Sequence, residues 1–512
     1  MWWCNALVRQ YVIACDIKTR FAKARVETGF PTRTCATTKE VVGIPFHSNG
    51  MPSSRPRSDA SRPCGRCDPA ADDAYDPISS ASVAAPVDGP SFRKAECKPG
   101  RRVIRRRYVI YVEGYDPQGA AGYHRLLQRA GRSFGSTWSI ALTLGPLQLD
   151  SEDLAHWEVE ACGPNWQVAT RYDFLRQERF IRADMAQPLL RHIPRALGWV
   201  CGDLVSGATL RIIRASWRFA LHLMVYQALL LVWLGLAAAA GLLVGAAGGE
   251  VGLSGALRWL AAAAAAFAVF VVLRPLAYRW GVIQITSCWP RLREFARGRP
   301  GWVDHVVDAG ARRLLAVARA GEVDEIVVVG HSAGGIAALA LMVRALELEP
   351  DLGRRGPNLV LLTLGSVMPA AALDPAAQRL RNLLKLIAGT PSVTWIDCCS
   401  RKDPLSFWGL DPVEGVGVRQ APRHNPLIWT VSIKDMLSPK SYARLKWSAF
   451  RRHYQFIMSG ERRAPYDYVM LIAGPAAVVD WARNADSLAA AFGSDGTFIE
   501  HPAADVGAGA SS

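Results

Sequence analysis

A serine between two glycines is the pattern with the clearest chemical meaning in this chain, at Gly330-His331-Ser332-Ala333-Gly334. The β-branched residues 325–329 before it predict a buried strand, and the Ala- and Leu-rich residues 334–348 after it predict a helix. A sharp turn from strand to helix exposes a serine hydroxyl, and the helix N-terminus stabilises negative charge that develops there. The pattern therefore predicts that Ser332 is a nucleophile and that the backbone N–H of Ala333 donates to an oxyanion.

The elements that must position this motif alternate between strands and helices. Further strands are predicted at residues 103–113, 138–144, 166–172, 358–364 and 392–398, with one or two more at 427–433 and 466–473. Helices are predicted from about residue 122, at about 184–204, and at 303–320, 334–348 and 378–387. This alternation predicts the α/β class, with a mostly parallel sheet that carries helices on both faces.

The motif region resembles the nucleophile elbow of α/β-hydrolases, and more narrowly that of the lipase-type members. Glu325-Ile-Val-Val-Val-Gly-His-Ser-Ala-Gly-Gly resembles the elbow itself, and Leu361-Leu-Thr-Leu-Gly-Ser366 resembles the strand that commonly follows it. The resemblance covers roughly residues 103–200 and 300–475. It implies a serine hydrolase that forms an acyl-enzyme on Ser332, with no cofactor and no metal.

The resemblance also implies a second oxyanion donor in the loop after an early strand. The matching positions are Gly114 and Tyr115, which follow the predicted strand that ends at Glu113. The sequence departs from the lipase pattern here, because it contains no His-Gly-Gly-Gly and has Glu113 where a histidine often stands.

The catalytic acid of such an enzyme follows the nucleophile and lies just past a later strand. Asp403 is the preferred candidate, since Asp403-Pro404 lies in a loop beyond the predicted strand at 392–398. Asp397 and Asp411 are the competing candidates.

The base must then be a histidine that is C-terminal to the acid. The sequence offers His424, His453 and His501. His424 precedes the predicted strand at 427–433, and His501 lies in the terminal tail. His453 is therefore preferred and His424 is second.

Two apolar segments predict a transmembrane hairpin inserted before the nucleophile strand. Residues 219–247 carry no formal charge, and this segment is longer than the roughly 20 residues needed to cross a bilayer. Residues 259–273 are long enough if Arg258 and Arg274 reach opposite interfaces, and a Gly-rich loop at 245–255 joins the segments. His222 in the first segment is interpreted as an interfacial residue.

Positive charge flanks the outer ends of both segments and is sparse between them. The flanking residues are Arg211, Arg214, Arg218, Arg279, Arg291, Arg293 and Arg297. The positive-inside rule then predicts two spans with both ends in the cytoplasm, and the Ala- and Arg-rich composition suggests a bacterial inner membrane.

The remaining composition limits the partners. The net charge of +16 comes mainly from scattered arginines, for which a general arginine bias of the proteome is the first explanation. Among acidic partners, the pattern favours a membrane surface over nucleic acid. The 11 cysteines show no disulfide-scaffold spacing, which indicates a reducing compartment. Cys64 and Cys67 form a lone CxxC and are interpreted as free thiols.

Five segments summarise the prediction. Residues 1–100 form a disordered tail, 101–210 and 281–480 form the α/β-hydrolase domain, 211–280 form the hairpin, and 481–512 form a flexible tail. The predicted function is membrane-anchored hydrolysis of a carboxylic ester, with lipids, small esters and thioesters as candidate substrates. The predicted partners are a lipid bilayer and a hydrophobic acyl ester. The alternative is a catalytically silent hydrolase scaffold that acts as a membrane receptor or interaction module.

Overall fold

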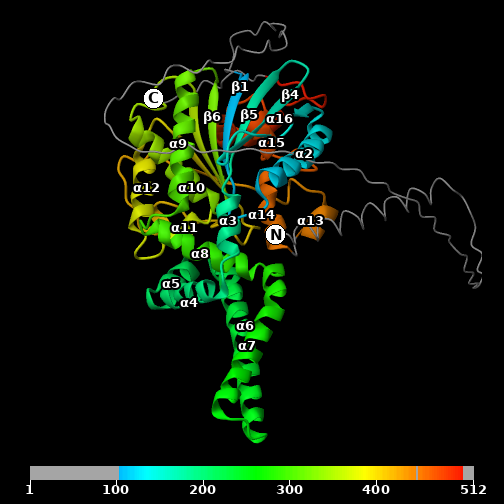
Figure 1. Cartoon of the computed structure of the whole chain (residues 1–512). Coiled ribbons are helices and arrows are strands. Elements are labelled where there is room, and N and C mark those ends of the chain that lie inside the picture. Colours follow the sequence, from blue (N-terminus) through cyan, green and yellow to red (C-terminus); the bar gives the residue numbers. More distant parts are fainter. Residues whose placement is uncertain (1–102, 446–447, 500–512) are drawn as a thin grey trace, which may run out of the picture. The chain divides into compact units, whose positions relative to one another are not determined.

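The computed structural model describes residues 103–445 and 448–499. Its strands are β1 (Arg106–Val112), β2 (Ala141–Leu144), β3 (Gln148–Leu149), β4 (Leu154–Cys162), β5 (Gln167–Leu175), β6 (Glu325–His331), β7 (Asn358–Leu364), β8 (Thr394–Cys399) and β9 (Leu427–Thr430). They form one sheet in the order β2-β4-β5-β1-β6-β7-β8-β9, with β3 paired to β4 (Figure 1). Strands β5, β1, β6, β7, β8 and β9 are parallel, and β2, β3 and β4 form an antiparallel edge. The predicted α/β class with a mostly parallel sheet is confirmed.

Helices connect and cover these strands. They are α2 (Gly119–Trp138), α3 (Glu178–Met185), α4 (Leu189–Val205), α5 (Ala208–Ala215), α6 (Trp217–Glu250), α7 (Gly255–Arg279), α8 (Val282–Ala296), α9 (Trp302–Ala320), α10 (Gly334–Leu348), α11 (Met368–Ala372), α12 (Gln378–Gly389), α13 (Pro439–Leu445), α14 (Ala449–Tyr454), α15 (Tyr468–Ala473) and α16 (Val478–Ala490). Figure 1 shows α9 and α10 on one side of the sheet and α2, α15 and α16 on the other, while α6 and α7 extend away from it.

The central strands place alternate side chains in two separate cores, because successive residues of a strand point to opposite faces. In β1, Tyr108, Ile110 and Val112 belong to the core that also contains α8, α9, α10 and α12. Val109 and Tyr111 belong to the core on the other face, with α2, α15 and α16. Both faces are apolar and covered, as a parallel sheet requires.

The predicted hairpin is formed by α6 and α7, which pack against each other along their lengths (Figure 1). At about 1.5 Å per residue, 34 and 25 residues give helices of about 50 and 37 Å, enough to cross a hydrocarbon core of about 30 Å. Outward-facing apolar side chains such as Leu242 and Val272 are exposed. In the described part of the chain, these two helices are each long and apolar enough to span a membrane.

The turn of the hairpin is shorter than predicted. The Gly-rich residues 245–255 were expected to form a loop, but α6 continues to Glu250. Gly241 and Gly245 lie against α7, where a Cβ on Gly241 would be 3.0 Å from the carbonyl oxygen of Ala262. These glycines therefore serve close helix packing, which is common between membrane helices.

Two predicted strands differ from the structure. Residues 466–473 were expected to form a strand, but α15 occupies most of this segment, and the side chain of Asp467 caps it by accepting from the backbone N–H of Val469 at 3.0 Å. All six residues of α15 are buried, so its sequence lacks the periodicity that distinguishes a helix from a strand. The strand predicted at 138–144 begins only at Ala141, because α2 continues through Trp138.

Strand β4 was not predicted, although buried Trp157 and Val159 alternate with exposed Glu158 and Glu160. Residues 481–499 were also expected to belong to a flexible tail, but most of α16 lies here and the side chains of Trp481 and Phe498 are buried. The predicted tail at 1–100, the thiols of Cys64 and Cys67, and His501 lie outside the described residues.

Candidate active site

Ser332 lies on a tight turn between the end of β6 and the start of α10. Its φ of 57° is in the left-handed region, which is unfavourable for a residue with a side chain. The glycines beside it are required by close contacts. A Cβ on Gly334 would lie 2.3 Å from the carbonyl oxygens of Val112 and Glu113. The turn therefore holds the serine in a strained conformation at the carboxyl end of the parallel strands.

The loop after β1 lies directly against this serine. A Cβ on Gly114 would be 3.2 Å from Ser332 Cβ and 3.7 Å from its Oγ. The next residue, Tyr115, is fixed through its carbonyl oxygen, which accepts a hydrogen bond from Gln284 Nε2 at 2.7 Å. Ala333 is the N-cap residue of α10 and lines the same pocket as Gly114 and Ser332. The predicted oxyanion residues are thus all adjacent to Ser332.

Asp403 and His453, 50 positions apart in the chain, meet beside this turn. His453 Nδ1 is 2.7 Å from Asp403 Oδ2, and both side chains are almost completely buried. Asp403 lies in the loop after β8, and His453 lies on α14. Because Nδ1–H donates to the carboxylate, the lone pair of the imidazole is on Nε2.

His453 is also close to the serine. Its Cε1 would be 2.7 Å from a Cβ on Gly365, and Leu364, the residue before Gly365, accepts the backbone hydrogen bond of Ser332 at 2.9 Å. His453 Nε2 is buried and has no hydrogen-bond partner among the described residues. Ser332 and His453 therefore line one pocket without a hydrogen bond between them, and such bonds are often long before substrate binds.

The competing candidates lie elsewhere. Asp397 is within β8 and accepts from Thr363 Oγ1 at 2.5 Å, and burial raises its pKa to about 6. Asp411 pairs with Arg423 at 2.5 Å. Partial burial would raise the pKa of Asp411, but the Arg423 guanidinium holds this pKa below its usual value. His424 is exposed and does not line the pocket of Ser332.

The neighbouring histidine of the motif, His331, remains neutral. Burial lowers its pKa well below the usual range, and the adjacent His453 lowers it further. The two rings are 4.7 Å apart. A neutral His331 adds no positive charge beside His453.

Asp116 links the loop after β1, which contains Gly114 and Tyr115, to the helix that carries His453. It is buried, and it accepts from Tyr123 Oη at 3.2 Å and from Tyr454 Oη. Burial raises the pKa of Asp116, and the hydrogen bonds from Tyr454 and Gln118 oppose this rise. The bond to Tyr454 joins the loop after β1 to α14, and therefore holds Gly114 and Tyr115 in a fixed relation to His453.

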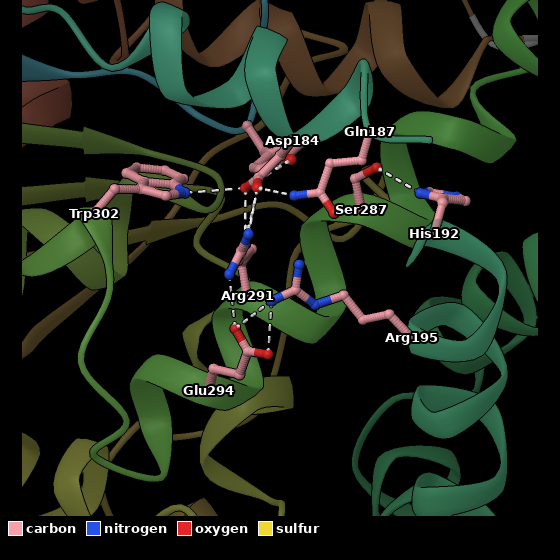
Figure 2. Close-up of polar contacts among 9 residues, drawn as sticks. Asp184, Gln187, His192, Arg195, Ser287, Arg291, Glu294 and Trp302 are labelled. Carbon is pink, nitrogen blue, oxygen red and sulfur yellow. Dashed lines mark hydrogen bonds and ion pairs between the residues drawn. The ribbon is translucent and has the colours of Figure 1, made fainter. Parts of the chain in front are cut away.

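A carboxylate at Asp184 supports the same loop from the other side. It accepts hydrogen bonds from Arg291 Nε at 2.8 Å and from Trp302 Nε1 at 2.9 Å (Figure 2). Tyr115 Oη is 3.5 Å from the same carboxylate. Arg195 and Arg291 both reach Glu294, which fastens α4 to α8. These contacts join helices α3, α4, α8 and α9 to one another beside Tyr115.

The pocket above Ser332 has a cavity volume of about 80 Å³ and mostly apolar walls. Its walls include Leu405 and Phe450, as well as Trp289 and Leu292 of α8. Phe219, His222 and Leu223 from the first two turns of α6 line the pocket as well. The contribution of a hairpin helix to the site was not predicted, because Phe219 and Leu223 carry no local signal beyond their apolar character.

The described residues contain no group of three or more His, Cys, Asp or Glu side chains that could hold a metal ion. In comparisons with known proteins, no family model, no curated protein and no solved structure matches the chain.

Proposed function

We propose that this protein is a membrane-anchored serine hydrolase of the α/β-hydrolase type that cleaves carboxylic esters. The observation that carries the proposal is that Ser332 and His453 line one pocket while Asp403 holds His453 from behind. Ser332 lies on a strained turn at a helix N-terminus, and His453, held by Asp403 at 2.7 Å, lines the same pocket. A nucleophile, an orienting acid and a base, in this order along the chain, are the parts that acyl transfer requires.

In the proposed reaction, His453 Nε2 takes the proton of Ser332 as Oγ attacks the acyl carbonyl carbon. The N–H groups of Ala333 and of the loop at Gly114 and Tyr115 stabilise the oxyanion. His453 then protonates the leaving alcohol, and the acyl group remains on Ser332. Water, deprotonated by His453, attacks this acyl-enzyme and releases the carboxylic acid. Asp403 fixes the imidazole and stabilises its positive charge throughout.

The walls of the pocket favour an ester with an apolar acyl group. Their lining of mostly apolar side chains would bury hydrocarbon. Phe219 and Leu223 belong to a helix that is long and apolar enough to span a membrane. A lipid ester is therefore the favoured substrate class over a small water-soluble ester.

The proposed location is the cytoplasmic side of a membrane. The Ala- and Arg-rich composition favours a bacterial inner membrane. The arginines that flank the outer ends of α6 and α7 would then face the cytoplasm. The lipid bilayer and the acyl ester are the proposed partners.

The test is labelling of the membrane-embedded protein with a fluorophosphonate probe, which reacts with activated serines. Wild type should be labelled, Ser332→Ala should not, and His453→Ala should be strongly impaired. His424→Ala is the matched control, because it removes an exposed histidine away from the pocket and should leave labelling unchanged. Hydrolysis of esters of increasing acyl length would then be measured, with activity expected to rise with length.

Absence of labelling in folded wild-type protein would overturn the proposal. It would favour the alternative of a silent scaffold with a receptor or interaction role, for which the missing hydrogen bond between Ser332 and His453 Nε2 is the supporting observation.

A further inference from the structure

The corner between α4 and α5 exposes apolar side chains that no part of the described chain covers. The two helices meet at an angle of 72°. At the corner, Leu204 is 63% exposed and Val205 is 90% exposed, and Leu210 and Ile213 continue the exposed apolar surface along α5. Soluble domains rarely leave such side chains grouped together, so this surface indicates an apolar partner.

The corner is held rigidly by the opposite face of α4. Asp203 is buried and forms an ion pair with Arg293 Nη1 of α8 at 2.8 Å. His192 is buried against Thr286 Oγ1 at 2.9 Å, and Figure 2 shows how His192 and Arg195 on α4 face α8. The exposed side of the corner therefore has a fixed direction, and the helices cannot rotate to bury it.

The corner adjoins the membrane hairpin along the chain. Helix α5 ends at Ala215 and α6 begins at Trp217, with Ser216 as the N-cap residue between them. Figure 1 shows α4 and α5 beside the start of α6, between the sheet and the long part of the hairpin. Side chains at the start of α6, such as Leu221, are also exposed and apolar. A bilayer around α6 would thus meet the corner at its surface.

Cationic residues border this apolar surface. Arg211, Arg214 and Arg218, on α5 and at the start of α6, are all exposed. Exposed Trp217 lies beside them, and tryptophan favours the level of the lipid head groups. Apolar residues bordered by arginine are typical of helices that lie in the surface of a membrane with anionic lipids.

We propose that α4 and α5 form an interfacial membrane-binding element, with Leu204 and Val205 in the acyl region and the arginines at anionic head groups. A third span is disfavoured, because the inner face of α4 is fastened to α8 by the buried pair of Asp203 and Arg293. The element depends on the hairpin being in a bilayer, and it does not depend on Ser332 being a nucleophile.

The test uses full-length protein in vesicles of phosphatidylcholine and phosphatidylglycerol, with a fluorescent non-natural amino acid at one position at a time. The position of Val205 is compared with that of Leu243, an exposed residue within α6, and with that of Leu149, which is 62% exposed on β3. Lipids brominated on the acyl chain should quench the probe at positions 205 and 243, because an interfacial helix inserts by about 5–10 Å. Aqueous iodide should quench the probe at position 149 alone.

Each other outcome overturns the proposal. Quenching by iodide at position 205 would show that the corner is in water. Shielding from both quenchers would indicate a protein partner or a second copy. If brominated lipid does not quench the probe at position 243, the hairpin is not in the bilayer and both proposals lose their membrane. If it fails to quench only at position 205, the interfacial element is refuted and the proposed hydrolase is unaffected.

The lipid-charge requirement is tested separately. Quenching at position 205 should be stronger in vesicles with phosphatidylglycerol than in pure phosphatidylcholine, and the double change Arg211→Gln and Arg214→Gln should abolish this difference. Arg354→Gln, at an exposed arginine in the loop after α10, is the control that should preserve it. If the double variant keeps the difference, the arginines do not bind head groups.

Discussion

Replacement of Asp403 by Asn is the sharpest test of the proposed machinery. The side chain is almost the same size, so the buried loop after β8 should keep its packing. The change removes the negative charge that lies 2.7 Å from His453 Nδ1. The imidazolium that forms when Ser332 loses its proton would then be buried without a counter-charge, and an amide N–H could hold the imidazole in the wrong tautomer.

The magnitude follows from this geometry. Two charges whose centres are about 4 Å apart interact by about 4 kcal/mol at an effective dielectric constant of about 20. Since about 1.4 kcal/mol corresponds to a tenfold change in rate, the loss should be about 10³-fold. The tautomer effect adds to it, and losses of about 10⁴ are typical of this substitution in Ser-His-Asp enzymes. We therefore expect Asp403→Asn to slow acylation by a factor of about 10³–10⁴.

The assay is the second-order rate of fluorophosphonate labelling at several pH values, with the melting temperature measured in parallel. Asp397→Asn is the matched control, because Asp397 contacts Thr363 and not a histidine, and it should label at close to the wild-type rate. A folded Asp403→Asn protein that labels within tenfold of wild type would refute the assignment of the acid. Slow labelling of a folded Asp397→Asn protein would indicate that Asp397 is the acid.

Three further changes test the packing, the electrostatics and the positioning of the site. Gly334→Ala should lower stability by about 2–3 kcal/mol, because its Cβ would lie 2.3 Å from two carbonyl oxygens. The loss should be measured as a fall in melting temperature. Gly198→Ala is the control that should not lower it, since its Cβ would meet nothing within 4 Å. The pKa of Asp397 is raised to about 6, above an unfolded value of about 4, so its contribution to stability falls as pH rises from about 4 to 6. Asp397→Asn should therefore gain up to about 3 kcal/mol relative to wild type between about pH 4.5 and 7.5, and an unchanged difference in denaturation experiments would contradict this. Tyr454→Phe removes the bond to Asp116 and should lower kcat about tenfold with little change in KM, while an equal rise in KM would indicate a role in binding instead.

The parts of the fold that were predicted well carry strong local signals. The bounds of α10 and β7 agree with the prediction, because a β-branched run, a glycine turn and an Ala-rich run each specify their own conformation. The hairpin was predicted from length and absence of charge alone. These properties act over a few neighbouring residues, so they can be read without knowledge of the remaining chain.

The errors lie where burial or pairing overrides local signals. Helix α15 is buried on all sides, so its apolar run could equally be a strand. The Gly-rich end of α6 stays helical because its glycines pack against α7, a contact that no local pattern reveals. Strand β4 has the alternation of a half-buried strand, but its polar residues and the short β3 before it obscured the signal.

The site divides in the same way. The sequence by itself determined the turn at Ser332, because its strain, its glycines and the helix behind it are consecutive in the chain. It limited the acid and the base to a few residues each, but it could not pair them. Only the tertiary structure joined Asp403 to His453 across 50 positions, since the residues around His453 on α14 carry no local mark of a catalytic base. It also brought Phe219 and Leu223 of α6 into the pocket from more than 100 positions before the serine, because the packing of whole helices, and not local preference, decides which distant surfaces meet.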